Sequence, residues 1–299
     1  MSQRIPVLMQ KQVMANFPER PRDSHKGMFG TVAVIGGASG MVGAPLLAAR
    51  AALRMGVGIV HVGFLADNAP VLDLVQPELM LHRAHDLFFP HPNPPPGGEG
   101  ADVKNMFNPD VLAIGCGLGH NTAAQKILYE ALKRDTALVL DADALNILAG
   151  RFDLQDDLRA RKTLSILTPH PGEAARLLCC STGEVQADRI AAVRYLAQKF
   201  ACSVVLKGAD SLIATRDGKL FINKTGNPGM SAAGLGDVLT GMIAAFIAQG
   251  MSADDALLLA VHLHGAAGDA LAQQIAAIGM TASEVTDWAR WLLNQWQSK

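Results

Sequence analysis

Short apolar runs recur along this 299-residue chain, and most are followed by glycine or turn residues and then by a helical pattern. The apolarity within each run is continuous rather than alternating, which is typical of strands buried on both faces. Strands that alternate with helices form a mostly parallel sheet with helices on both faces. The sequence therefore predicts an α/β fold of three layers, α/β/α. The runs are TVAVIGG from Thr31, GIVHVGF from Gly58, VLAIGCG from Val111, ALVLDAD from Ala137, LSILTPH from Leu164 and SVVLKGAD from Ser203.

Helical patterns lie between these runs and also follow the last of them. SLIAT and KLFIN flank Asp217-Gly218, a pair favoured in the two-residue turns of β-hairpins, so a hairpin is predicted there. The predicted helices are Ala44–Met55, Thr122–Arg134, Val185–Phe200, Gly234–Gly250, Ala253–Ala272 and Ser283–Gln297.

The chain shows no linker rich enough in glycine, serine or charge to separate two domains. We expect one domain over residues 1–299, with an N-terminal extension over residues 1–23. FFPHPNPPPGGEG, from Phe88, combines five prolines with three glycines. This composition predicts a surface loop over residues 88–100, with no chemistry of its own.

Charge and hydropathy exclude some classes of partner. The formal net charge is −1, which argues against a nucleic-acid binder that relies on bulk positive charge. No stretch approaches the ~18 apolar residues of a membrane span, and the N-terminus lacks the apolar core of a signal peptide. The four cysteines form no CxxC pair, so we expect reduced thiols and a cytoplasmic protein.

Three glycine-rich turns stand at predicted strand ends: Gly36–Gly40, Gly115–Gly119 and Gly226–Gly229. Ligands of open α/β sheets bind at the carboxyl ends of strands, where glycine lets backbone N–H groups approach a phosphate. Glycine is also the default turn residue, so any one of these turns could be purely structural. A P-loop pattern is absent, and GCGLG matches the dinucleotide-binding pattern only in part.

The most specific pattern is GMSAAGLGDVLTG over Gly229–Gly241, where a glycine-dense turn runs into a strongly apolar helix. The amides of Gly234, Leu235 and Gly236 would face outward at the helix N-terminus, where they stabilise an anion. Asp237 would lie in the first turn, beside this anion hole. Taken alone, the pattern leaves two interpretations open: a catalytic carboxylate, or a helix-start acid favoured by the helix dipole.

Taken together, the motifs resemble the NAD(P)H-hydrate dehydratases of the ribokinase-like superfamily. The resemblance runs from about Ser24 to about Trp288, and its most specific motif is GxGD over Gly234–Asp237, at the start of an apolar helix. It implies a ribokinase-like fold and a carbon–oxygen lyase that removes water from the (6S)-hydrate of NADH or NADPH. In this reaction ADP, or ATP in eukaryotic members, phosphorylates the 6-hydroxyl and phosphate then leaves. The resemblance also implies Mg²⁺ and a homotetramer. The matching segments are His25-Lys26-Gly27, TVAVIGGASGMVGAPLLAARAALRMGVGIV, LAIGCGLG, LDADALNIL, LTPHPGEAARLL, VLKGAD, GNPGMSAAGLGDVLTGMI, HGAAGD and MTASEV.

The resemblance further implies roles for single residues. The catalytic group is Asp237 as base with Gly234 and Gly236 in the anion hole. The residues that bind the hydrated dinucleotide are Ala44, Gly117, Gly119, His170 and Asp237. The residues that bind the nucleotide are Lys207, Gly208, Ala209, Asp210, Ser211 and Gly236. No residue is assigned as a metal ligand, although Glu173 is a candidate.

Leu235 departs from the family pattern, which commonly has Ser or Thr there, so a side-chain donor is lost while the backbone amides remain. Two other functions stay open: a ribokinase-like kinase for a vitamin or other small molecule, and a non-catalytic nucleotide-binding regulator.

Other histidines and acids carry weaker signals. His82 and His85 could bind a metal from one helix face, although no further ligands stand nearby. His264 is expected to be packed within its helix. Asp141 and Asp143 end a strand, where they could contact a dinucleotide or Mg²⁺.

Overall fold

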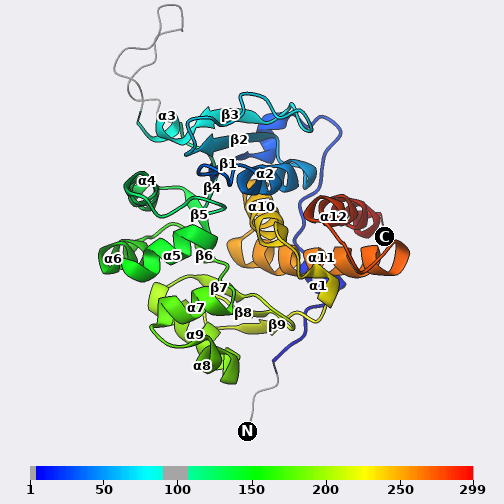
Figure 1. The fold of residues 1–299 in the computed structure, drawn as a ribbon. Coiled ribbons are helices and arrows are strands. Elements are labelled where there is room, and N and C mark those ends of the chain that lie inside the picture. The colour runs from blue at the N-terminus through cyan, green and yellow to red at the C-terminus, as the bar shows by residue number, and fades with distance from the viewer. Residues whose placement is uncertain (1–4, 90–106, 299) are drawn as a thin grey trace, which may run out of the picture.

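The computed structural model describes residues 5–89 and 107–298. Its centre is one nine-stranded sheet in the order β3-β2-β1-β4-β5-β6-β7-β8-β9 (Figure 1). Strands β1 to β7 are parallel, and β8 is antiparallel to both of its neighbours. The predicted, mostly parallel sheet and the hairpin are thus confirmed. The strands are β1 Thr31–Gly36, β2 Ile59–Phe64, β3 Met80–Arg83, β4 Val111–Ile114, β5 Ala137–Leu140, β6 Ser165–Leu167, β7 Ser203–Leu206, β8 Leu212–Ala214 and β9 Leu220–Ile222.

Helices cover both faces of the sheet, which confirms the three layers (Figure 1). One core cluster packs α2, α10, α11 and α12 against one face, and the other packs α3 to α9 against the opposite face. The helices are α1 Gln10–Val13, α2 Gly43–Arg54, α3 Ala84–Phe88, α4 Thr122–Lys133, α5 Ala142–Gly150, α6 Phe152–Ala160, α7 Pro171–Leu178, α8 Thr182–Ala187, α9 Arg189–Phe200, α10 Leu235–Ala248, α11 Ala253–Gln274 and α12 Ala282–Gln297, with 3₁₀ helices η1 Lys26–Phe29 and η2 Pro228–Met230.

One predicted helix is wrong in its extent. The pattern over Val185–Phe200 is divided at Asp188 into α8 and α9, because the backbone of Asp188 leaves helical geometry at φ −143° and ψ 77°. The Asp188 side chain accepts a hydrogen bond from the Ala191 N–H and so caps the start of α9. The other predicted helices begin and end within two residues of α2, α4, α10, α11 and α12.

The interpretation of His82 and His85 as neighbours on one helix face is also wrong. His82 lies on the edge strand β3, which the sequence did not predict, and His85 lies on α3. The ring of His82 instead faces the neighbouring strand β2, with its Nε2 atom 2.9 Å from Nδ1 of His61. Phe107 packs edge-on against the His61 ring.

The N-terminal segment lies along the far edge of the sheet. The Leu8 N–H donates to the carbonyl of Ile222 on β9, and Leu8 and Val13 are buried. The predicted loop over residues 88–100 falls almost entirely in residues 90–106, outside the described residues. Within the part of the chain that the structure describes, no helix is both long and apolar enough to cross a membrane.

Candidate active site

The order of the strands reverses between β1 and β4, and the loops after these strands meet at that point. The Ala38 N–H donates to the carbonyl of Gly117 at 2.7 Å. A side-chain carbon on Gly117 would lie 2.8 Å from Cβ of Met41 and 3.3 Å from Cβ of Ala44, so only glycine fits here. Crevices at such reversal points are where open α/β sheets bind ligands. The structure therefore brings together two of the predicted substrate residues, Ala44 and Gly117.

The N-terminus of α10 faces the same edge of the sheet. Gly234 precedes the helix with φ +87°, a left-handed conformation that favours glycine. A side-chain carbon there would lie 2.5 Å from Cδ1 of Leu47 on α2, so glycine also lets the two helices pack closely. Gly234 has no side chain to cap the helix, so the first amides of α10 are left for an anion. Leu235 is buried in the core and leaves this backbone arrangement intact.

Asp237 lies in the first turn of α10 and is half-buried. Burial raises the pKa of the Asp237 carboxyl to about 6, the neighbouring Asp141 adds to the rise, and the Cys116 thiol and the Lys207 ammonium oppose it. At neutral pH the group is therefore mostly ionised yet more basic than an ordinary aspartate. Both properties suit a general base.

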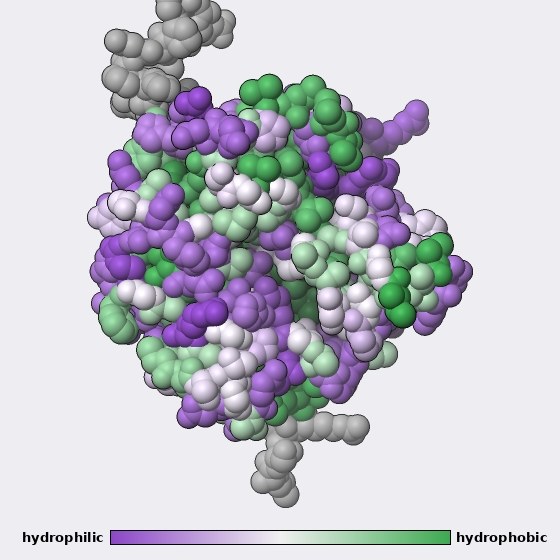
Figure 2. All heavy atoms as spheres, viewed as in Figure 1, coloured by the Kyte–Doolittle hydropathy of each residue, from purple (hydrophilic) through white to green (hydrophobic). Residues whose placement is uncertain are grey.

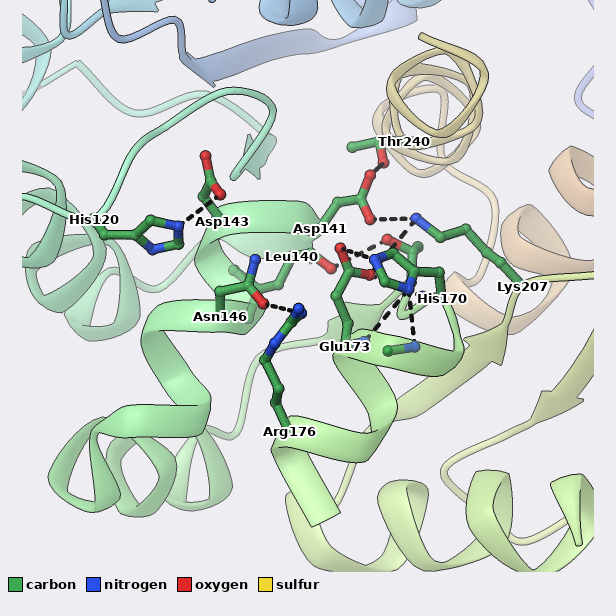
Figure 3. A network of polar contacts seen from close by, with 12 residues as sticks. His120, Leu140, Asp141, Asp143, Asn146, His170, Glu173, Arg176, Lys207 and Thr240 are labelled. Atoms are coloured by element: carbon green, nitrogen blue, oxygen red, sulfur yellow. Dashed lines mark hydrogen bonds and ion pairs between the residues drawn. The ribbon is translucent and has the colours of Figure 1, made fainter. Parts of the chain in front are cut away.

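Lys207, directly after β7, links the end of this strand to Asp141, which follows β5. Its Nζ atom lies 2.7 Å from Oδ1 of Asp141, whose Oδ2 accepts from the Thr240 hydroxyl at 2.9 Å (Figure 3). Burial alone would lower the pKa of Lys207, but Asp141 and then Glu173 outweigh it and the pKa is raised. A side-chain carbon on Gly236 would lie 3.3 Å from Nζ. A permanent positive charge thus lies beside the anion hole.

His170 and Glu173 form a capping box at the start of α7. Nδ1 of His170 accepts from the Gly172 N–H at 2.9 Å, and Oε2 of Glu173 accepts from the His170 N–H at 2.8 Å. Nε2 of His170 lies 3.2 Å from Oε1 of Glu173 (Figure 3). Burial lowers the pKa of His170 and raises the pKa of Glu173 to about 6. The His170 ring is half-exposed, so it can meet a ligand in a fixed orientation.

The amide of Gly119 is already used inside the protein. It donates to Oδ2 of Asp143 at 2.8 Å, and the other oxygen of Asp143 lies 3.1 Å from Nε2 of His120. A ligand at Gly119 would therefore meet its carbonyl or Cα rather than its N–H.

The structure places the Lys207 side chain beside Gly236 but apart from the other four predicted nucleotide-binding residues. Gly208, Ala209 and Asp210 lie in an exposed turn between β7 and β8, while the Lys207 side chain leaves this turn for Asp141. The Ser211 hydroxyl donates to the Gly208 carbonyl at 3.0 Å. Arg189 donates to the Ala209 carbonyl, and Lys224 pairs with Asp210, so the turn is held from both sides.

Known proteins resemble this chain over nearly its whole length. Residues 32–290 match the family model described as NAD(P)H-hydrate dehydratase. The chain belongs to the NAD(P)H-hydrate dehydratase family. It is 43% identical over 283 residues to the ADP-dependent (S)-NAD(P)H-hydrate dehydratase of Neisseria meningitidis, which covers 93% of this chain and 90% of that protein. It spans about half the length of the bifunctional NAD(P)H-hydrate repair enzymes that it also matches.

Solved structures place this dehydratase family member in the ribokinase-like fold. A crystal structure of the ADP/ATP-dependent NAD(P)H-hydrate dehydratase of Bacillus subtilis, obtained with ATP and Mg²⁺, matches with a TM-score of 0.84 and 29% identity. The match covers 99% of this chain and 100% of that one. A ribokinase-like superfamily protein of Enterococcus faecalis matches with a TM-score of 0.80 and 25% identity, over 97% of this chain and 96% of that one.

Among the residues that the structure describes, one group has donor atoms close enough together to meet a metal ion. The ligand atoms of Cys116, Asp141 and Asp237 lie within 4.8 Å of one another. Burial and the adjacent carboxylates raise the pKa of the Cys116 thiol well above its usual range, so it stays protonated. Both oxygens of Asp141 are already bonded, and both oxygens of Glu173 lie against His170. These donors suit an ammonium and N–H groups better than a dication.

Two functional contacts were missed by reasoning from the sequence. The Lys207–Asp141 pair joins residues that are 66 positions apart, and the Sγ atom of Cys116, from another loop, lies within 4.8 Å of a carboxylate oxygen of Asp237. A lysine and an aspartate that each follow a buried strand give the only sequence signal for the first contact. The second contact has none.

Proposed function

We propose that this protein is an ADP-dependent dehydratase that restores NADH and NADPH from their (6S)-hydrates. The observation that carries the proposal is the carboxylate of Asp237 at the uncapped N-terminus of α10, with the Lys207 ammonium beside the same amides. The relative from Neisseria meningitidis carries this activity in its name, and the relative from Bacillus subtilis was crystallised with ATP and Mg²⁺.

The reaction divides between phosphoryl transfer and elimination. Asp237 accepts the proton of the 6-hydroxyl while the hydroxyl oxygen attacks the terminal phosphorus of ADP and AMP leaves. The amides of Leu235 and Gly236, together with Lys207, stabilise the charge that develops on the transferred group. The C6–O bond then breaks with loss of phosphate, pushed by the ring nitrogen lone pair. Loss of a proton from C5 restores the dihydropyridine.

We assign the two ligands to neighbouring parts of one edge of the sheet. The hydrated dinucleotide would lie at the β1/β4 reversal, against Ala44, Gly117, Gly119 and His170. The adenosine phosphates of ADP would follow the turn over residues 208–211. Mg²⁺ would enter on the phosphates and neutralise part of their charge, because Asp141 and Glu173 are engaged within the protein.

The test is turnover of hydrated NADH with Mg²⁺ and either ADP or ATP, followed by return of the reduced-nicotinamide absorbance and by release of phosphate. Asp237→Asn should lower turnover by ~10²-fold or more, since a positioned base contributes at least this factor. Ligand binding, measured by calorimetry, should persist. Because the pKa of Asp237 is raised to about 6, kcat/KM of the wild type should fall as the pH drops through 6 and the carboxylate is protonated.

The same assay separates the alternatives. A ribokinase-like kinase for a vitamin or other small molecule would accumulate a phosphorylated product without free phosphate. A nucleotide-binding regulator would bind ADP without turnover. Full activity of Asp237→Asn would contradict the proposed mechanism, whatever the substrate.

We also propose that the ribokinase-like body is a single domain that assembles as a homotetramer and acts in the cytoplasm. Support for assembly comes from hydrophobic side chains gathered over the loop between β2 and β3 (Figure 2). Val71 and Leu74 there are 94% and 88% exposed. Such contiguous apolar surface marks interfaces. Cys179 is exposed and forms no disulfide, which agrees with the reduced thiols of a cytoplasmic protein.

A further inference from the structure

Cys116 is a buried thiol that reaches the carboxylate of Asp237 from the glycine-rich turn after β4. Its Sγ atom and one carboxylate oxygen each of Asp237 and Asp141 lie within 4.8 Å of one another. The side chain of Cys116 is fully buried, which keeps water away from its S–H group, and the thiol lowers the pKa of Asp237. We propose that Cys116 is a positioning residue, whose S–H group donates to Asp237 and holds one carboxylate oxygen so that the other is free for the substrate hydroxyl. The inference rests on the proposed role of Asp237 as the base.

The surroundings of Cys116 keep the thiol both protonated and in place. Burial, followed by the charges of Asp237 and Asp141, raises its pKa well above the usual range, and the Lys207 ammonium opposes this only weakly. The backbone is fixed as well, since the Cys116 carbonyl accepts from the Gly37 N–H at 3.1 Å. A thiol that cannot ionise under working conditions can act only as a donor toward a carboxylate.

The strength of the donor matters because Asp237 lies among several charges. Asp141 and Asp143 raise the pKa of Asp237, and Lys207 and the Cys116 thiol lower it. A thiol is a weak donor, so it orients the carboxylate without removing the basicity that burial supplies. A hydroxyl at the same place would stabilise the ionised form more strongly, and a methyl group would not stabilise it at all.

The test compares Cys116→Ala and Cys116→Ser with a matched control, Cys202→Ala. Cys202 is also buried, but it belongs to the core cluster on the opposite face of the sheet. In the pH profile of kcat/KM with hydrated NADH and ADP, Cys116→Ala should move the acidic limb upward by about half a unit to one unit, the size expected for one lost hydrogen bond. For Cys116→Ser, the midpoint of the acidic limb should lie at or below that of the wild type. For Cys202→Ala, the midpoint should match that of the wild type.

A second readout does not depend on turnover. The S–H stretching band of the wild-type protein, measured in the infrared, should shift as the pH passes through the titration of Asp237. In Asp237→Asn this pH dependence should disappear, while the bands of Cys179, Cys180 and Cys202 stay the same. Subtracting the Cys116→Ala spectrum assigns the shifting band to Cys116.

The inference is overturned if no S–H band responds to pH in the wild type, or if Cys116→Ala and Cys202→Ala share one midpoint. Failure of the proposed function is a different result. The wild type would then show no turnover of hydrated NADH, while the infrared measurement would still report on the contact between Cys116 and Asp237.

Discussion

At the residue scale, the ion pair of Lys207 with Asp141 holds the site together. The Asp141 side chain is 2% exposed and keeps only the Thr240 hydroxyl if the ammonium is removed. Leaving a buried charge without its partner costs about 3–5 kcal/mol. We therefore expect Lys207→Met to lower the free energy of unfolding by about this amount in urea denaturation.

The control for this prediction removes both charges. Asp141→Asn combined with Lys207→Met keeps a hydrogen-bonding partner for Thr240 and buries no charge. The double variant should be more stable than Lys207→Met alone, because the cost arises from the unpaired carboxylate. Wild-type stability in the single variant would show that water reaches Asp141 and replaces the ammonium.

The sequence predicts those parts of the site whose residues are close neighbours along the chain. Gly234, Gly236 and Asp237 are neighbours along the chain, so their meeting at the start of α10 follows from the local pattern. His170 is predicted to face a ligand, and the structure also uses its ring to cap α7, as a Glu three residues later could have indicated. The choice of Lys207 as the partner of Asp141 depends on strand order, which no local pattern contains.

At the scale of elements, the start of α10 depends on a glycine that combines backbone geometry with close packing. Gly234 and Gly218 share φ +87°, but a side-chain carbon on Gly234 would meet Leu47 of α2 and Ala282 of α12, whereas Gly218 faces open space in the β8–β9 hairpin. Both alanine variants should lose about 1–2 kcal/mol to the left-handed backbone. Only Gly234→Ala should also lower kcat, by up to about 100-fold, because the amides of the anion hole are displaced.

Denaturation and turnover measured on both alanine variants separate the two effects. If Gly218→Ala lowered kcat as much as Gly234→Ala, the loss would reflect global stability rather than the position of α10. Equal and wild-type kcat in both variants would show that α10 can tilt without harm to the anion hole.

The fold itself is predictable where elements are long and periodic. Helices α2, α4, α10, α11 and α12 follow from sequence, as do the strands buried on both faces. The misses have local causes. The edge strand β3 is four residues long and only half-buried, so it lacks a continuous apolar run. The break between α8 and α9 rests on one residue, Asp188, whose side chain caps the second helix more favourably than it continues the first.

At the scale of the whole molecule, the exposed apolar loop between β2 and β3 is the surface through which we propose that copies of the chain associate. Its Val71 and Leu74 side chains are nearly as exposed as in an extended chain. Phe152 is 69% exposed, but the other large hydrophobic side chains of α6 are buried. Burying such a loop against another copy removes apolar surface from water on both sides of a symmetric contact. If the proposed tetramer forms through this loop, Leu74→Lys should shift sedimentation to smaller species, and Phe152→Lys should leave the distribution unchanged. A tetramer that persists in Leu74→Lys would place the contact between copies elsewhere on the surface.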